Sequence, residues 1–258
     1  MKVEEIMTTN VTVTKKNDLL TNARAILRKT GYRMLPVVDD ENRVIGVIGR
    51  SDVLRIASSK TNLTVGSLMK KPVTATPNSD LVYVARQMVD NSIRQVAIVD
   101  KENKLLGIVS SLDVLKGLIK GEYKIKKNFV EEIMNKDVLF CYEDDDVSRI
   151  WRVMLNARIG GIPVVKKKGK KNIVVGFVTM WDMIKKGFRM EVERGKYTSM
   201  KISKVMQSIL KYLHPEDKIS DVIDLMLKNR IIRVPIVDKE KNLVGIVDIE
   251  DVLRAYLE

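Results

Sequence analysis

The sequence reads Met34-Leu-Pro-Val-Val-Asp39, then Val44-Ile-Gly-Val-Ile48, then Asp52, and this order decides the fold because it occurs four times. The other copies run from Gln95 to Asp113, from Gly161 to Asp182 and from Arg233 to Asp251. The closing Asp residues are separated by 61, 69 and 69 positions. A unit of this size is unlikely to close a hydrophobic core by itself, so we expect neighbouring copies to share one.

Each copy has the same predicted order of elements: helix, strand, helix, strand, strand, helix. A short helical piece ends at a Met, and a brief strand follows. The next helix is amphipathic, as Leu81, Val84, Ala85, Met88 and Val89 show by their spacing. Two apolar strands joined by a short polar turn predict an antiparallel hairpin buried on both faces, and the last helix is expected to begin at the Asp. The fold class is therefore α/β (α+β).

Composition narrows the classes of function. The 258 residues carry a net charge of +13, and part of it is concentrated in Lys166–Lys171 and in the linker Lys185–Lys201. Such a basic surface attracts nucleic acid or phosphorylated small molecules, although a solvated hairpin tip and a solvated linker are the simpler explanation of the two lysine runs. No segment is apolar enough for a membrane span, and the single Cys141 fits a reducing compartment, so we expect a cytoplasmic protein without a membrane partner.

Motifs for catalysis are missing from the sequence. It contains no Gly-x-Gly-x-x-Gly, no Walker loop and no nucleophile elbow, and its single His214 has no second His with which to bind a metal. We therefore expect no enzyme activity, no catalytic residues, no metal site and no required cofactor.

The fourfold pattern resembles the CBS domain, over nearly the whole chain. The resemblance implies four tandem repeats, at 1–60, 61–122, 128–190 and 200–258, which form two Bateman modules in a disc-like, pseudo-symmetric arrangement. A free-standing array of four repeats is similar to archaeal stand-alone CBS proteins and to the γ subunit of AMP-activated protein kinase. It implies a regulatory, energy-sensing protein that binds AMP, ADP or ATP, or S-adenosylmethionine, in clefts between repeats.

The family's ligand pattern is Gly, two apolar residues, Ser or Thr, two further residues and Asp. It is complete at Gly107 to Asp113, with Ser110, and at Gly176 to Asp182, with Thr179. Hydroxyl and carboxylate oxygens can bind a ribose diol, while the helix N-terminus favours phosphate. The same pattern is also a capping box that merely begins a helix, and this alternative stays open. Copies one and four depart from the pattern with Gly49 and Asp248, although Asp52 and Asp251 remain.

Basic and apolar residues complete the set that the resemblance implies. Arg33 and Arg94 lie three residues before Pro36 and Ala97, and Arg233 lies two before Pro235. Basic residues of the family at these places contact the phosphates of the ligand. Copy three has Gly160 and Gly161 there. The base is expected to contact the strand of the partner repeat: Val73 for the ligand of Asp52, Val11 for that of Asp113 and Val138 for that of Asp251. Copy four is read as having one extra residue before its strand, so no residue is assigned for Asp182.

Three functions remain open at this point. The preferred one is a sensor of adenine nucleotides that acts on an unidentified regulated protein. The resemblance to the family also implies that the chain forms a homodimer. The alternative is a nucleic-acid-binding CBS protein that uses its basic surface. A structural oligomerisation module is the third.

Overall fold

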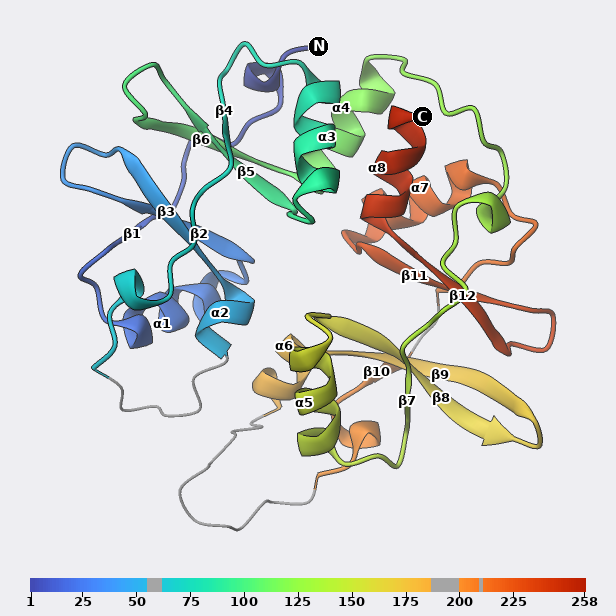
Figure 1. Ribbon diagram of the computed structural model, residues 1–258. Coiled ribbons are helices and arrows are strands. Elements are labelled where there is room, and N and C mark those ends of the chain that lie inside the picture. The colour runs from blue at the N-terminus through green and yellow to red at the C-terminus, as the bar shows by residue number, and fades with distance from the viewer. Residues whose placement is uncertain (55–61, 187–199, 209–210) are drawn as a thin grey trace. The chain divides into compact units, whose positions relative to one another are not determined.

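The computed structural model describes residues 1–54, 62–186, 200–208 and 211–258, so most of the basic linker 185–201 lies outside the described residues. The chain divides into two compact units (Figure 1). Unit 1 contains Met1–Lys126 together with Val252–Glu258, and unit 2 contains Lys127–Asp251. Copies one and two thus lie in unit 1, and copy three with most of copy four lies in unit 2.

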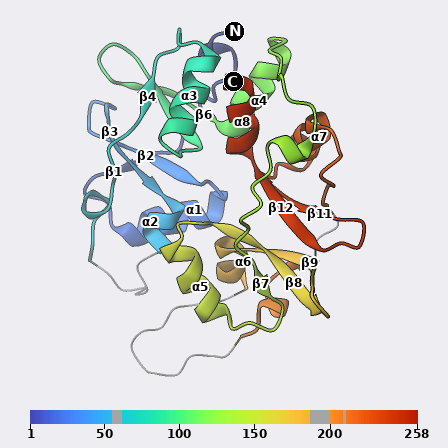
Figure 2. The same ribbon diagram turned by 45° about the vertical axis from the view of Figure 1, so that its right-hand side comes forward.

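The elements of unit 1 follow the predicted order in both copies. Each copy begins with a short 3-10 helix and ends with an α-helix, and the bounds in copy one are η1 Val3–Glu5, β1 Thr14–Lys15, α1 Leu20–Thr30, β2 Met34–Val38, β3 Val44–Gly49 and α2 Arg50–Leu54. Those in copy two are η2 Val65–Ser67, β4 Thr74–Ala75, α3 Leu81–Asp90, β5 Gln95–Val99, β6 Leu105–Ser110 and α4 Ser111–Lys120. Figure 2 shows α1 and α2 together beside the strands of copy one.

Unit 2 repeats this order. Copy three contains η3 Val130–Glu132, β7 Cys141–Tyr142, α5 Val147–Asn156, β8 Gly161–Lys168, β9 Lys171–Thr179 and α6 Met180–Lys185. Copy four contains η4 Ile202–Lys204, β10 Gln207–Ser208, α7 Ile219–Asn229, β11 Arg233–Val237, β12 Leu243–Asp248 and α8 Ile249–Leu257. In all four copies the last helix begins two residues before the Asp of the repeated pattern, so the expectation that it begins at the Asp is wrong by half a turn.

The hairpins are antiparallel, as predicted. In copies one, two and three the short first strand pairs in parallel with the first strand of the hairpin. The strand orders are β1-β2-β3, β4-β5-β6 and β10-β9-β8-β7, while β11 and β12 form a two-stranded sheet. Pairing with β1 begins at Val37, one residue after Pro36. In copy two, where Ala97 stands in place of the Pro, the pairing begins at Ala97 itself. Proline has no N–H to donate, which explains why the ladder begins one residue later in copy one.

The two copies of each unit share a hydrophobic core, as expected. In unit 1, Val38 and Val44 of copy one pack with Ala97 and Val99 of copy two. In unit 2, Val165 and Val174 of copy three pack with Val237 of copy four. The predicted apolar face of α3 is buried along its whole length. Burial of such faces is the main stabilising contribution to a small α/β unit.

Each copy also extends the sheet of its partner copy. The segment after each Met pairs with the Gly-containing hairpin strand of the other copy: Thr8 with Ile108, Lys70 with Val47, Asn135 with Ile246 and Gln207 with Phe177. This close approach explains the Gly in those strands. A Cβ at Gly176 would lie 2.8 Å from the Gln207 carbonyl oxygen, and one at Gly46 would lie 2.8 Å from the Met69 sulfur.

Among the helices that the structure describes, none combines the length and the apolar character that crossing a bilayer requires.

Candidate functional site

The four Asp residues of the repeat all stabilise the start of a helix. Each carboxylate accepts the backbone N–H of the residue three positions earlier, at 2.9 Å for Asp52, 3.0 Å for Asp113 and Asp182 and 2.7 Å for Asp251. These bonds satisfy a backbone donor that the helix leaves unpaired. The first function of this position is therefore structural in every copy.

Ser110 and Thr179 complete true capping boxes. The Ser110 hydroxyl donates to Asp113 Oδ2 at 2.6 Å and accepts the Asp113 N–H at 3.4 Å. Thr179 makes the same pair of contacts with Asp182. The capping interpretation is thus confirmed for both residues. It accounts for only one oxygen of each carboxylate, which leaves the second oxygen for another partner.

The second carboxylate oxygen has a different environment in each copy. Asp52 Oδ1 forms an ion pair with Lys70 Nζ at 2.6 Å, and Asp182 Oδ1 accepts the side-chain amide of Gln207 at 2.6 Å. Both carboxylates are buried, with 7% and 8% of the residue exposed. Asp113 is half-buried, and both hydrogen bonds that it accepts from described residues reach Oδ2. Within the described part of the chain, Asp113 Oδ1 has no partner.

Lys70 and Gln207 occupy one equivalent position, which the sequence analysis missed. Each follows the Met that ends the short leading helix and pairs with the Gly strand of the partner copy. Thr8 and Asn135 hold this position in copies one and three. The signal in the sequence was the residue directly after each Met, which is Thr, Lys, Asn and Gln in the four copies. The chemistry facing each Asp therefore differs from copy to copy.

Arg33 and Arg94 lie at matching places, next to the last helix of their copies. Their carbonyl oxygens accept the N–H of Arg50 at 2.8 Å and of Ser111 at 2.9 Å. Ile232 of copy four makes the same backbone contact with Ile249, and Gly160 makes it in copy three. Arg33 is exposed and Arg94 half-buried. The backbone of Arg33 and of Arg94 therefore lies beside the N-terminus of the last helix of its copy.

Arg233 lies one residue later in its copy than Arg33 and Arg94 do, as its spacing of two residues to Pro235 indicates. It is the first residue of β11 and pairs in register with Asp248, as Gln95 does with Ser110. Its Nε donates to Asp248 Oδ2 at 2.6 Å, and its Nη1 donates to the Gly161 carbonyl at 3.0 Å. Both side chains of the ion pair are largely buried. Arg233 and Asp248 thus bind each other and join copy four to copy three.

The three predicted apolar contacts, Val11, Val73 and Val138, are half-buried, unlike the fully buried core. Strand pairing corrects the spacing assumed for copy four. The position equivalent to Thr14 lies seven residues after the Met in copies one, three and four, but six residues after it in copy two. Copy two is therefore one residue shorter, and copy four has no extra residue. The residue that matches Val11 in copy four is Leu210, which lies outside the described residues.

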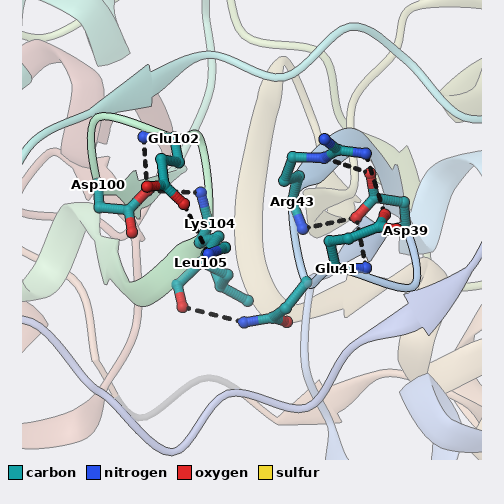
Figure 3. A network of polar contacts seen from close by, with 8 residues as sticks. Asp39, Glu41, Arg43, Asp100, Glu102, Lys104 and Leu105 are labelled. Atoms are coloured by element: carbon teal, nitrogen blue, oxygen red, sulfur yellow. Dashed lines mark hydrogen bonds and ion pairs between the residues drawn. The ribbon is translucent and has the colours of Figure 1, made fainter.

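A second polar cluster lies at the hairpin turns of unit 1 (Figure 3). Arg43 binds Asp39 at 2.7 Å and Glu41 at 3.0 Å, while Lys104 binds Glu102 at 2.6 Å. Desolvation opposes ionisation of Asp39, but hydrogen bonds from Arg43 hold the pKa of that carboxyl below its usual value. Glu41, Arg43, Glu102 and Lys104 line an open hollow, and each ion pair lies within one turn. Backbone hydrogen bonds join the two turns, from the Val44 N–H to the Asn103 carbonyl at 2.9 Å and from the Leu105 N–H to the Asn42 carbonyl at 3.0 Å.

The part of the chain that the structure describes contains no group of three or more His, Cys, Asp or Glu residues arranged to hold a metal ion. Cys141 is buried in the core of copy three, and burial raises the pKa of its thiol to about 12. A thiol in this environment is protonated at neutral pH and is a poor nucleophile or metal ligand.

Two curated proteins of Methanocaldococcus jannaschii are similar in sequence. Protein MJ1225 is 32% identical over 197 residues, which cover 71% of this chain and 69% of that protein. Protein MJ1404 is 27% identical over 263 residues, and this chain spans 61% of its length.

Solved structures agree with this relationship. The crystal structure of MJ1225, described as a candidate archaeal homologue of g-AMPK, has a TM-score of 0.84 at 20% identity and covers 99% of this chain and 100% of its own. A conserved protein of Pyrococcus horikoshii has a TM-score of 0.71 at 22% identity with the same coverage. The profile of the CBS domain matches residues 3–59, 65–120, 130–188 and 202–258. The chain therefore belongs to the CBS domain family and contains four copies of that domain.

Proposed function

We propose that the chain is a non-catalytic regulatory protein that binds adenosine-containing ligands in clefts between its CBS repeats. AMP, ADP and ATP are the preferred ligands, and S-adenosylmethionine is the alternative that shares their adenosine group. The observation that carries the proposal is the unpartnered Oδ1 of Asp113 at the start of a ten-residue helix. A carboxylate oxygen suits a ribose diol because it accepts two hydroxyl hydrogen bonds at once.

The surroundings of Asp113 supply the other groups that a nucleotide needs. The backbone of Arg94 lies beside the start of α4, because its carbonyl accepts the Ser111 N–H. We expect the guanidinium of Arg94 to contact the phosphate of the ligand near the positive end of α4. The segment of copy one that contains Thr8 pairs with Ile108, and half-buried Val11 follows on that segment as the proposed contact for the base.

The other clefts are expected to bind more weakly. At Asp52 and Asp182 a ligand must first displace Lys70 or Gln207 from the carboxylate. At the fourth position Arg233 and Asp248 are already bound to each other. A displaced Lys70 ammonium could then contact phosphate, which would favour charged nucleotides over adenosine at that cleft.

The ligand of Asp113 would contact both copies of unit 1, which gives a route for regulation. Binding that favours one arrangement of the two copies shifts the population towards it, and a regulated protein can bind that arrangement selectively. We place this function in the cytoplasm, where adenine nucleotides and reduced thiols occur, and expect the protein to act as a homodimer.

Isothermal titration calorimetry with AMP, ATP and S-adenosylmethionine tests the proposal. Inorganic phosphate and GMP serve as controls for charge and for the base. We expect saturable heat with at least one adenosyl compound and a rise in melting temperature with the same compound. An absence of heat and of any thermal shift with all three would overturn the proposed function.

A further inference from the structure

The β8–β9 hairpin is longer than its counterparts in the other three copies (Figure 1). β8 has eight residues and β9 has nine, whereas the matching strands elsewhere have five and six. The additional pairs are Lys166 with Ile173, Lys167 with Asn172 and Lys168 with Lys171. At about 3.4 Å per residue, the ribbon continues roughly 10 Å beyond the point where the other hairpins turn.

The turn of this hairpin is well defined by its sequence. Gly169 and Lys170 connect the paired residues Lys168 and Lys171, and Gly169 has a φ of 61°. A Gly with positive φ at the first of two connecting residues is the signature of a type II′ turn, whose twist matches that of a β-ribbon. The lysines are therefore displayed on an ordered two-stranded ribbon.

The ribbon carries one sign of charge. No acidic residue occurs between 161 and 179, and Lys166, Lys167, Lys168 and Lys170 are exposed. At the base of the extension Lys166 pairs with Glu143, and beside the turn Lys171 pairs with Glu240. Lys167, Lys168 and Lys170 have no ion pair with any residue in the described ranges. Three ammonium groups at the tip thus remain available to a partner.

We propose that this ribbon binds the phosphate backbone of duplex DNA without sequence specificity. The major groove of B-DNA is wide enough for a two-stranded ribbon. Neighbouring residues of a strand point to opposite faces, so Lys166 and Lys168 lie on one face and Lys167 on the other. Charge on both faces suits a groove that has phosphates on either side. Contacts to phosphate position a protein on the duplex but carry no sequence information, which is why no sequence preference is expected.

The composition of the tip argues against other anionic partners. The stretch Lys166 to Asn172 contains no apolar or aromatic side chain, whereas helices and loops that bind membrane surfaces insert such side chains. Protein–protein interfaces are depleted in Lys and depend on Trp, Tyr and Arg. Backbone phosphates require none of these groups.

Fluorescence anisotropy with a labelled DNA duplex of about 20 base pairs, measured between about 50 and 200 mM KCl, tests the proposal. The test variant replaces Lys167, Lys168 and Lys170 with Gln. A matched control replaces Lys29, Lys101 and Lys116, which are exposed residues of unit 1, with Gln, so that both variants have the same net charge. Circular dichroism confirms that both variants are folded.

We expect native protein and control to bind alike, with affinity that falls steeply with salt. The hairpin variant should bind more weakly, and the slope of log K against log salt should be smaller by about 2.7, since each phosphate contact contributes about 0.9. Equal losses in both variants, no binding of native protein at about 0.1 M salt, or binding of phosphatidylserine vesicles in place of the duplex would overturn the proposal. Tighter binding to an RNA duplex of the same sequence would also overturn it, because the A-form major groove is too narrow. Adenosyl-ligand titrations are independent of these outcomes.

Discussion

Replacing Asp113 with Asn separates the two functions that one side chain can have. In the native protein, Oδ2 accepts the Ser110 N–H at 3.0 Å and the Ser110 hydroxyl at 2.6 Å. An Asn side chain can keep both bonds by turning its carbonyl oxygen towards Ser110. Its amide nitrogen then stands where Oδ1 was, and an amide NH₂ cannot accept a hydrogen bond from a ribose hydroxyl.

The two effects differ in size. Helix capping is retained, and only the interaction of a negative charge with the start of α4 is lost, so stability should fall by less than about 1 kcal/mol. A hydrogen bond to a charged group contributes about 1.5–3 kcal/mol. Since about 1.4 kcal/mol corresponds to a factor of ten, the affinity for AMP should fall about ten- to hundredfold.

Calorimetric titration with AMP and urea unfolding of the same variants measure both quantities. Asp80→Asn is the matched control, since Asp80 caps α3 of the same copy by accepting the Val82 N–H at 2.8 Å. Asp80→Asn should leave the affinity unchanged. A result in which Asp113→Asn binds AMP as tightly as the native protein would refute the reasoning and leave Asp113 as a helix cap only.

Three further outcomes are expected. Lys70→Met should lower the free energy of unfolding, measured in urea, by about 1 kcal/mol, because it leaves the buried Asp52 carboxylate unpaired. The effect stays small because solvent screens the exposed Lys70 ammonium, and Lys70→Arg should restore the stability. Arg233→Met should lower the free energy of unfolding more than the double replacement of Arg233 and Asp248 by Met does, because the single change leaves the largely buried Asp248 charge unpaired. Equal losses of stability in a double-mutant cycle would contradict this. The raised pKa of Cys141 means that its protonated thiol contributes to the free energy of unfolding. This contribution should be complete below the pKa of the unfolded thiol and should be lost as the pH rises from about 9 towards 12. A disulfide reagent at about pH 8 should accordingly label native protein slowly and urea-unfolded protein rapidly.

The sequence was sufficient for the elements and the shared core, because periodicity and turn residues determine them locally. The face of α3 and the four antiparallel hairpins follow the predicted pattern. The expectation that both hairpin strands are buried on both faces holds only for the first. β2 has four consecutive buried residues, whereas buried and half-buried residues alternate along β3.

The details of the candidate site depend on contacts between copies, which spacing within one copy does not reveal. Lys70 and Gln207 reach their Asp partners only because each leading segment pairs with the strand of the other copy. The distance of Arg233 to Pro235 already gives its register, since Gln95 lies equally far before Ala97, but that distance does not reveal which side chain Arg233 faces. Pairing across β11 and β12 shows that Arg233 faces Asp248.

A crystal structure of the protein grown with millimolar AMP tests the central claim most directly. The account predicts a nucleotide between the two copies of unit 1, with its ribose hydroxyls within hydrogen-bond distance of Asp113 Oδ1 and its phosphate near Arg94. An unoccupied Asp113, or a nucleotide bound elsewhere on the chain, would contradict it.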